Sequence, residues 1–465
     1  MRDVLSAVIG KSVRQVARLR GGGSALPGLV VEKMDPGFLQ RTLARLPYGV
    51  IAVSGTNGKT TTVKMIVEIL EAQGLKVFTN RTGSNFSRGI VAAAIQECSL
   101  GGRIDADIAV LELDEAHAMY FIDRVRPRFT LLLNVLRDQL DRFGEIDTTA
   151  KLLQRIADAT TDGLVVNRED RLVAQIGERT RARAERDGDR SGPGGVRPQV
   201  REFGLSGELL ALFPSDDDFH AAGPGSTADD DAREAADVTL LEVGDHEAVF
   251  RIDGESHRTP LKLEGLYNTF NAAAALATVR MVLDAGPSPA FFGWIDRSGR
   301  PQEPDTEAII SSLAEVRPAF GRGEQLELDG QPLELVLVKN PAGFKLALAS
   351  FAPAGVASMI AINDQYADGR DMSWLWDVDF GSLAEAGGVD TVAGTRAWDM
   401  ALRLEHDDVP VGHVEEDLSR ALQGFRARTM PVGGAGRPRR IFCTYTAMLA
   451  LRKELAALTE VEDIW

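Results

Sequence analysis

The segment SGTNGKTT (54–61) constrains the fold of this chain more than any other feature of its sequence. It follows the apolar run GVIAVS (49–54), which is typical of a buried strand. A helical pattern then runs from Lys59 to about Ala72 and stops at Gly74. A glycine-rich turn between a buried strand and a helix is typical of phosphate-binding loops. We therefore expect a nucleotide site at the edge of a parallel α/β sheet.

The residue types in this loop fit the chemistry of a nucleoside triphosphate. Glycines let backbone N–H groups surround phosphate oxygens, and the start of the helix adds partial positive charge. Lys59 could reach the β- and γ-phosphates, and the Thr60 hydroxyl could bind Mg²⁺. Val53 stands where the usual motif has its first glycine, and a tight turn with an incidental lysine is the structural alternative. The predicted nucleotide-binding residues of the loop are Gly55, Thr56, Asn57, Gly58, Lys59, Thr60 and Thr61.

A candidate metal ligand follows a later strand. The run IAVLEL (108–113) contains Glu112, and Asp114 and Glu115 come directly after it. Ligands bind beyond the carboxyl ends of parallel strands, so we predict that Glu112 binds Mg²⁺ together with Thr60. A solvated acidic loop is the alternative for this segment taken alone.

Alternating strand and helix patterns predict two α/β domains. The expected strands lie at 75–78, 108–113, 130–135 and 164–166, and in a second series at 333–338, 358–363, 389–394 and 440–445. We expect an N-terminal helical segment (1–45) packed on a central domain (46–316), followed by a C-terminal domain (317–465).

One stretch of the central domain, at about 183–235, departs from this pattern. It is rich in Gly, Pro, Ser and charge, which predicts a mobile insertion with little core. A few antiparallel strands (237–263) and a long alanine-rich helix (267–284) are expected after it. The only two cysteines of the chain, Cys98 and Cys443, are too few for a four-cysteine zinc site, so no structural zinc is expected.

The composition of the chain limits the kinds of binding partner and the cellular compartment that we expect. The 52 Lys and Arg residues against 68 Asp and Glu give a net charge of −16, which argues against nucleic acid as the main partner. Two cysteines fit a reduced, cytoplasmic compartment. Basic residues are spread through the apolar residues of the N-terminus, which predicts a packed amphipathic helix rather than a secretion signal. A helix on a membrane surface is the alternative. These basic residues are Arg2, Lys11, Arg14, Arg18 and Arg20.

Four motifs of the chain point to one family of enzymes. GTNGKTTT (55–62) is similar to the ATP loop of the Mur ligases, which make peptidoglycan precursors, and of folylpolyglutamate synthase. NVLRDQLDRFG (134–144) resembles a segment that usually reads DHLDRHG, and GLYNTFNAA (265–273) resembles a segment near the adenine. FGRGE (320–324) resembles the GRxE segment where the C-terminal domain begins. The resemblance implies a P-loop, parallel-sheet ATPase domain followed by a Rossmann-like α/β domain.

Five further motifs narrow the resemblance within this group: NRTGSNFSRGI (80–90), LELDEAHA (111–118), RDQLDRFGEID (137–147), KNPAG (339–343) and NDQYADGRDMSWLWD (363–377). With these motifs the chain resembles the MurT family, the ligase-like subunits of lipid II isoglutaminyl synthase. The resemblance implies ATP-dependent amidation of the D-glutamate α-carboxylate in the lipid II stem peptide to D-isoglutamine. An acyl phosphate would be attacked by ammonia, which a GatD-like glutamine amidotransferase subunit would supply. The expected place of action is the cytoplasmic face of the plasma membrane.

The resemblance also implies roles for residues outside the loop. Asn268 and Asn271 lie one helical turn apart, and Asn271 is expected at the adenine. Asn167, after the strand at 164–166, is a further nucleotide candidate, and Arg322 is expected at the γ-phosphate. Helix and loop capping is the structural alternative for the asparagines.

Asp371 is expected to act on the partner subunit. The resemblance implies that its carboxylate completes the Cys–His pair of the glutaminase across the interface. The alternative is an N-cap of a helix that starts near Ser373.

Two features depart from the family patterns, and the missing lysine weighs against a ligase that adds an amino acid. Mur ligases carry a carbamylated lysine after the DHLD segment, and here only Lys151 follows, out of register. Many MurT-like chains have a four-cysteine ribbon that this chain lacks. The alternatives are a stand-alone ligase that adds an amino acid, a non-catalytic nucleotide-dependent scaffold and, more distantly, a folylpolyglutamate synthase.

Overall fold

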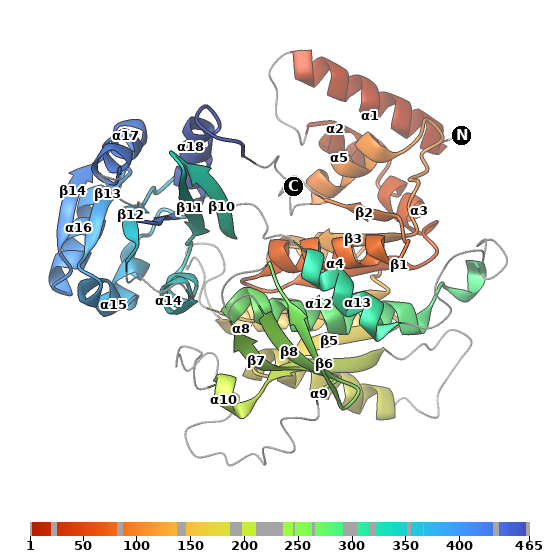
Figure 1. Ribbon diagram of the computed structural model, residues 1–465. Coiled ribbons are helices and arrows are strands. Elements are labelled where there is room, and N and C mark those ends of the chain that lie inside the picture. The colour runs from red at the N-terminus through yellow and green to blue at the C-terminus, as the bar shows by residue number, and fades with distance from the viewer. Residues whose placement is uncertain are drawn as a thin grey trace. The chain divides into compact units, whose positions relative to one another are not determined.

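The structure of the protein is a computed structural model, shown in Figure 1. It describes residues 2–19, 26–80, 87–136, 146–186, 198–210, 236–244, 247–262, 266–291, 305–316, 322–350, 355–365, 367–430 and 437–461. The chain divides into two compact units. Met1–Val135, Ile146–Lys262 and Asn268–Val316 form the first, and Arg317–Trp465 with two short earlier segments forms the second.

The first unit is built on a sheet whose described strands have the order β2-β3-β1-β4-β5-β6-β7-β8-β9. Neighbours from β2 to β7 pair in parallel, and β8 and β9 continue the sheet as antiparallel strands. The strands are β1 (Gly49–Ser54), β2 (Val77–Thr79), β3 (Ile108–Glu112), β4 (Phe129–Leu132), β5 (Gly163–Asn167), β6 (Gln199–Leu205), β7 (Val238–Gly244), β8 (Glu247–Ile252) and β9 (Glu255–Pro260).

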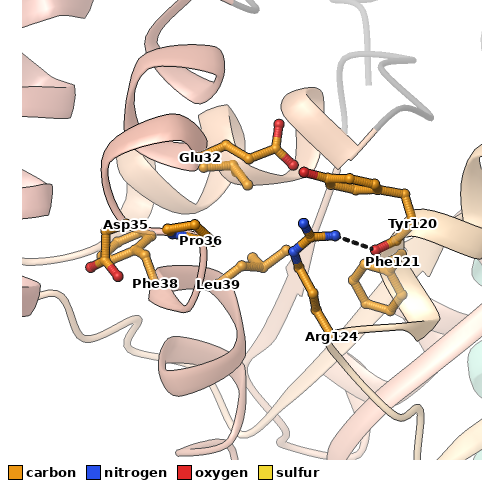
Figure 2. A pocket seen from close by; sticks show the side chains of 9 residues that line it. Glu32, Asp35, Pro36, Phe38, Leu39, Tyr120, Phe121 and Arg124 are labelled. Carbon is orange, nitrogen blue, oxygen red and sulfur yellow. Dashed lines mark hydrogen bonds between the residues drawn. The ribbon is translucent and has the colours of Figure 1, made fainter.

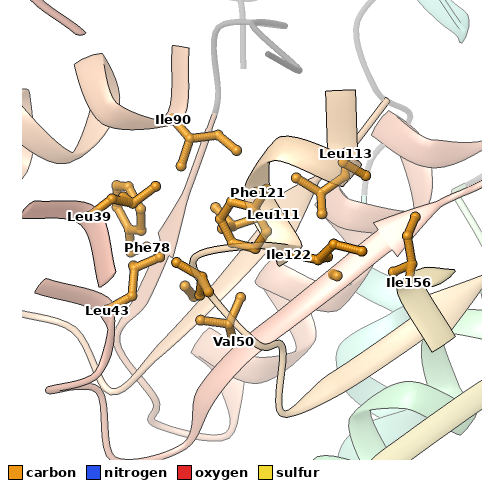
Figure 3. Packing of buried hydrophobic residues seen from close by; sticks show 14 of the residues in the cluster. Leu39, Leu43, Val50, Phe78, Ile90, Leu111, Leu113, Phe121, Ile122 and Ile156 are labelled. Carbon is orange, nitrogen blue, oxygen red and sulfur yellow. The ribbon is translucent and has the colours of Figure 1, made fainter. Parts of the chain in front are cut away.

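Helices that precede, connect and follow these strands complete the first unit and cover the apolar faces of the sheet. They are α1 (Arg2–Leu19), α2 (Leu26–Met34), α3 (Phe38–Leu43), α4 (Lys59–Ala72), α5 (Ser87–Glu97), α6 (Glu115–Ile122), α8 (Ile146–Ala159), α9 (Arg171–Arg186), α10 (Gly207–Leu210), α12 (Leu266–Ala285) and α13 (Thr306–Glu315), with the 3₁₀ turn η2 (Pro289–Phe291). Figure 3 shows part of one core, where Leu39 and Leu43 of α3 pack near Val50, Leu111 and Phe121. The N-terminal helices therefore share their core with the sheet.

A small hollow lies where α2 and α3 meet α6 (Figure 2). Arg124 lies over the ring of Tyr120, 3.6 Å from its centroid, and donates to the Tyr120 carbonyl oxygen at 3.1 Å. Burial, followed by the hydrogen bond with Glu32, raises the pKa of the Tyr120 hydroxyl. None of the predicted site residues lines this hollow.

The second unit holds a sheet with the order β10-β11-β15-β12-β13-β14. β10 (Arg322–Leu328) and β11 (Gln331–Leu337) form an antiparallel hairpin, and the remaining pairs are parallel. Asp329 and Gly330 both have positive φ, +57° and +71°, as a two-residue hairpin turn requires. The other elements are β12 (Ala357–Ala361), β13 (Val389–Ala393), β14 (Val411–Glu415), β15 (Arg439–Cys443), α14 (Pro341–Ser350), η3 (Ser373–Asp377), α15 (Gly381–Glu385), α16 (Ala397–His406), α17 (Leu418–Arg428) and α18 (Tyr445–Leu455).

The α/β class with mostly parallel sheets is confirmed, and the structure differs from the sequence prediction at three strands. Residues 198–210 fall within the predicted insertion, yet β6 pairs with β5 and β7 and buries Phe203 and Leu205. The prediction of little core was therefore wrong for this part, while 187–197 and 211–235 lie outside the described residues. β10 and β14 were also missed; β14 has only half-buried and exposed residues, so its hydrophobic pattern is weak.

Candidate active site

The turn between β1 and α4 has the backbone of a phosphate-binding loop. Gly55 and Gly58 have φ of +133° and +86°, which side chains strongly disfavour. A Cβ atom at Gly55 would lie 2.9 Å from the backbone N of Asn134, and one at Gly58 would lie 2.8 Å from the side-chain amide of Asn271. Both positions therefore require glycine, and the strand, the turn and the helix have the predicted bounds.

Asn134 braces the loop from the carboxyl end of β4. Its Oδ1 accepts from the Asn57 backbone N at 2.8 Å, and its Nδ2 donates to the Asn57 carbonyl oxygen at 3.1 Å. Its own carbonyl oxygen accepts from the Thr56 N at 3.0 Å. Sequence reasoning assigned Asn134 no role; the available signal was an asparagine two residues after a buried strand.

Lys59 lies folded over the loop. Its Nζ donates to the carbonyl oxygens of Gly55 and Thr56, the second at 3.3 Å, and lies 3.6 Å from a carboxylate oxygen of Glu115. Only 8% of Lys59 and 4% of Glu115 is exposed to solvent. The site therefore holds a buried cation directly at the start of α4, where phosphate binding would need one.

Thr60 and Glu112, the two predicted metal ligands, are in contact. The Thr60 hydroxyl donates to a Glu112 carboxylate oxygen at 2.8 Å, because parallel pairing sets Glu112 opposite Val53 at the end of β1. Asn80, which sequence reasoning missed, clamps Glu112: its Nδ2 donates to the Glu112 carbonyl oxygen at 2.9 Å and its Oδ1 accepts from the Glu112 N at 3.0 Å. A hydroxyl and a carboxylate side by side fit a hard cation such as Mg²⁺.

The other acidic residues near Glu112 have structural roles. Asp114 caps α6 by accepting from the His117 N at 3.5 Å. Among the described residues, no group of three or more His, Cys, Asp or Glu side chains is placed to hold a metal by itself. Thr60 and Glu112 would thus need phosphate oxygens or water to complete a Mg²⁺ shell.

The three predicted asparagines are in different environments. Asn271 of α12 is buried against Gly58, and its Nδ2 has no hydrogen-bond partner within the part of the chain that the structure describes. A buried orphan donor beside the phosphate loop fits a ligand contact. Asn167 is also buried, but its Nδ2 donates to the Leu133 carbonyl oxygen at 2.8 Å and its Oδ1 accepts from the Glu169 N at 2.9 Å. Asn268 lies in the first turn of α12, half-buried.

Arg322 and Asp371 lie in the second unit. Arg322 is the first residue of β10. Asp371 lies on the segment after β12 and is exposed, and its Oδ1 accepts from the Ser373 N at 2.9 Å at the start of η3. Hydrogen bonds from the Ser373 side chain and backbone lower the pKa of Asp371, so its carboxylate is ionised at neutral pH.

A buried aspartate anchors the Asp371 segment to α18. Asp368 accepts from the Thr446 N at 2.7 Å and from its hydroxyl at 2.5 Å. Burial raises the pKa of Asp368, and these hydrogen bonds oppose the rise. Of the two tryptophans that follow, Trp374 packs inside the unit against Phe344, and Trp376 is half-exposed beside His406. The aspartate-rich segment is therefore held firmly, with Asp371 facing solvent.

Comparisons with known proteins agree with this geometry. Residues 53–188 match the family model of the Mur ligase middle domain, and residues 337–448 match that of the MurT ligase C-terminal domain. The chain is 29% identical over 98% of its length, and of the relative's, to the lipid II isoglutaminyl synthase (glutamine-hydrolyzing) subunit MurT of Streptococcus pneumoniae R6. Its identity to the same subunit of Staphylococcus aureus COL is 27%, over 93% of this chain and 94% of that one.

A solved structure shares the fold. The MurF ligase of Thermotoga maritima in complex with ADP aligns with a TM-score of 0.59 and 16% identity, covering 90% of this chain and 83% of that one. The chain therefore has a Mur ligase-like α/β fold. More specifically, the chain is similar to MurT subunits over nearly its whole length, so the recognition made from the motifs is confirmed.

Proposed function

We propose that this chain is the ATP-dependent ligase subunit of a lipid II isoglutaminyl synthase of peptidoglycan biosynthesis. The observation that carries the proposal is the intact loop, with Lys59 over it and Thr60 bonded to Glu112, in a chain similar to MurT subunits from end to end. Residues 46–316 would form the ligase domain, and residues 317–465 the domain that meets the partner. The predicted segment around Asp138 lies outside the described residues.

Nucleotide binding follows from the loop. The backbone N–H groups of Gly55 to Thr61 and the Lys59 ammonium would hold the phosphates, with Arg322 at the γ-phosphate. Thr60 and Glu112 would hold Mg²⁺, which neutralises phosphate charge when bound. The unpartnered Nδ2 of Asn271 suits an acceptor on the adenine, and Asn268 is a second candidate. Asn167 would act through the loop around Leu133, because both ends of its amide already bind backbone groups.

The reaction would take place in two transfers. An oxygen of the D-glutamate α-carboxylate attacks the γ-phosphorus of ATP, the bond to the β–γ bridging oxygen breaks, and ADP leaves. Ammonia then attacks the acyl carbon through its nitrogen, inorganic phosphate leaves with the C–O electron pair, and the nitrogen loses a proton to give D-isoglutamine. The residues around Lys59 would mainly position the reactants and neutralise charge.

Ammonia would come from a second chain. Both cysteines of this chain are buried, and burial raises the pKa of both thiols, which is the opposite of an activated nucleophile. We propose a GatD-like class I glutamine amidotransferase as the partner. The ionised, exposed carboxylate of Asp371 would hydrogen-bond the imidazole of its Cys–His pair and fix the tautomer.

The proposed place of action is the cytoplasmic face of the plasma membrane, where a lipid-linked peptide would be available. Within the described ranges, no helix combines the length and the apolar character needed to cross a bilayer.

The deciding experiment is co-purification with the amidotransferase subunit followed by an amidation assay on lipid II. We expect ATP-dependent formation of D-isoglutamine with glutamine, and with ammonium when the partner is omitted. A stand-alone ligase would instead take an amino acid as the attacking amine and would show no activity with ammonium. A nucleotide-dependent scaffold would show no turnover of ATP with lipid II, and either result would contradict the proposal.

A further inference from the structure

Helix α1 is packed on one side and open on the other. Ala7 and Ala17 are buried, and a Cβ atom at Gly10 would lie 2.8 Å from Ile95 of α5 and 3.0 Å from Val31 of α2. This close approach fixes the rotation of α1 about its own axis. Figure 1 shows α1 alongside α2 and α5 in the first unit.

The open side of α1 is apolar. Val4, Leu5, Val8 and Val16 are exposed to 45%, 59%, 40% and 50%. Their spacing of three, four and eight residues places them on one face of the helix, opposite Ala7, Gly10 and Ala17. An amphipathic helix of a monomer normally turns such a face to the core. In α1 the opposite face, with Ala7, Gly10 and Ala17, already packs against the core. The exposed row of Val4, Leu5, Val8 and Val16 is therefore available to another partner.

The α1 segment carries a net positive charge, although the chain as a whole is acidic. Five of the first 20 residues are Lys or Arg, against one acidic residue, Asp3, while the whole chain has a net charge of −16. The Asp3 carboxylate is neutralised by Arg41 at 2.8 Å and Arg45 at 2.5 Å. Lys11, three residues after Val8, lies at the border of the apolar row, and Arg2 is exposed. Apolar side chains flanked by cations are the pattern of helices that lie in the head-group region of a membrane.

We propose that α1 docks the chain on the surface of an anionic phospholipid bilayer, with the row of Val4, Leu5, Val8 and Val16 between the head groups and the basic side chains at lipid phosphates. The proposed function supplies only the reason for docking: an enzyme with a lipid-linked substrate gains access to it at the membrane. The docking itself is argued from α1 alone. A second copy of the chain or a partner protein could also cover this face, and the test separates these occupants.

The test is co-sedimentation of the full chain with vesicles that contain no lipid II, without nucleotide. We expect at least ~10-fold stronger binding to phosphatidylglycerol-rich vesicles than to pure phosphatidylcholine, and weaker binding as NaCl is raised. The double variant Leu5→Glu/Val8→Glu should lose binding by ~10-fold or more, because two charges replace inserted apolar groups. The matched control is Leu458→Glu in the second unit, where the leucine is 45% exposed; it should bind like the wild type.

Two further measurements keep the result interpretable. The thermal midpoint of Leu5→Glu/Val8→Glu should stay near the wild-type value. If the double variant is destabilised, the single variant Val16→Glu replaces it in the vesicle-binding assay. Both α1 variants, Leu5→Glu/Val8→Glu and Val16→Glu, should amidate detergent-solubilised lipid II at the wild-type rate. This assay tests the proposed function, and the vesicle assay tests docking, so the two can fail independently.

The proposal would be overturned if the wild-type protein did not bind anionic vesicles, or if the α1 variants bound them as well as the wild type does. A dimer in light scattering that the α1 variants convert to monomer would instead assign the face to a second copy. Loss of the amidotransferase complex in these variants would assign it to the partner subunit.

Discussion

The Nζ atom of Lys59 lies 3.6 Å from the carboxylate of Glu115, and both side chains are buried. A nucleotide that draws Lys59 toward its phosphates would leave Glu115 buried without this cation. The pair therefore links the stability of the loop to its function.

Lys59→Ala should lower ATP-dependent amidation at least ~100-fold, because it removes a main charge stabiliser of the transferred phosphoryl group. It should also lower the free energy of unfolding by ~1–3 kcal/mol, since Glu115 loses a buried counter-ion. The double variant Lys59→Ala/Glu115→Gln should recover much of the stability and none of the activity. Urea denaturation and steady-state rates on the same samples check both parts; equal stability of the single and double variants would contradict the coupling.

Thr60→Val should raise the Mg²⁺ concentration needed for half-maximal activity by ~10-fold or more. Valine has nearly the shape of threonine but lacks the hydroxyl that lies 2.8 Å from Glu112. Magnesium titrations of ADP formation measure the shift, and Asp105→Asn at an exposed carboxylate is the matched control. An unchanged magnesium titration would remove Thr60 from the metal site.

The parts of this site that depend on neighbouring residues in the chain could be predicted from the sequence. The bounds of β1 and α4 match the predicted ones, because a short apolar run, two glycines and a helical pattern each act over a few residues. Glu112 was found by a rule about strand ends, and parallel pairing with β1 does bring it to Thr60. Such rules depend only on the direction of the strands.

The missed residues depend on contacts between distant segments. Asn134 reaches Asn57 across 77 positions of sequence, and Asn80 reaches Glu112 across 32. No pattern near either asparagine indicates its partner. β6 was missed for another reason: its first four residues are half-buried or exposed, and only Phe203–Leu205 are buried, so it resembles the polar stretches around it. Its place in the sheet comes from pairing with β5 and β7.

Asp371→Asn should lower glutamine-driven amidation by ~100-fold or more while leaving ammonium-driven amidation within about twofold of wild type. Asparagine retains the oxygen that accepts from the Ser373 N, so the segment should keep its shape. The control is Asp377→Asn, an exposed carboxylate on the same segment. Equal losses with glutamine and with ammonium would assign Asp371 to the ligase site or to folding.

The hairpin turn at Asp329 should make stability of the second unit depend on pH. Hydrogen bonds from Arg426 at 2.6 and 2.7 Å, and from the fully buried Arg439 at 3.2 Å, hold the pKa of Asp329 below its usual value. A carboxyl with a lowered pKa in the folded state stabilises the fold above its unfolded pKa of about 4, and the contribution is lost as pH falls through the folded value. Asp329→Asn tolerates the same positive φ but carries no charge, so it should cost ~1–2 kcal/mol at pH 7.

The difference between Asp329→Asn and wild type should then shrink as the pH is lowered from 4 toward 2, because protonation removes the same charge from the wild type. Urea denaturation of the full chain at pH 7, 4 and 3 measures this. Glu327→Gln, an exposed carboxylate on the neighbouring strand, should stay within ~0.5 kcal/mol of wild type throughout. A constant difference between Asp329→Asn and wild type across these pH values would mean that turn geometry, rather than the charge, makes Asp329 important.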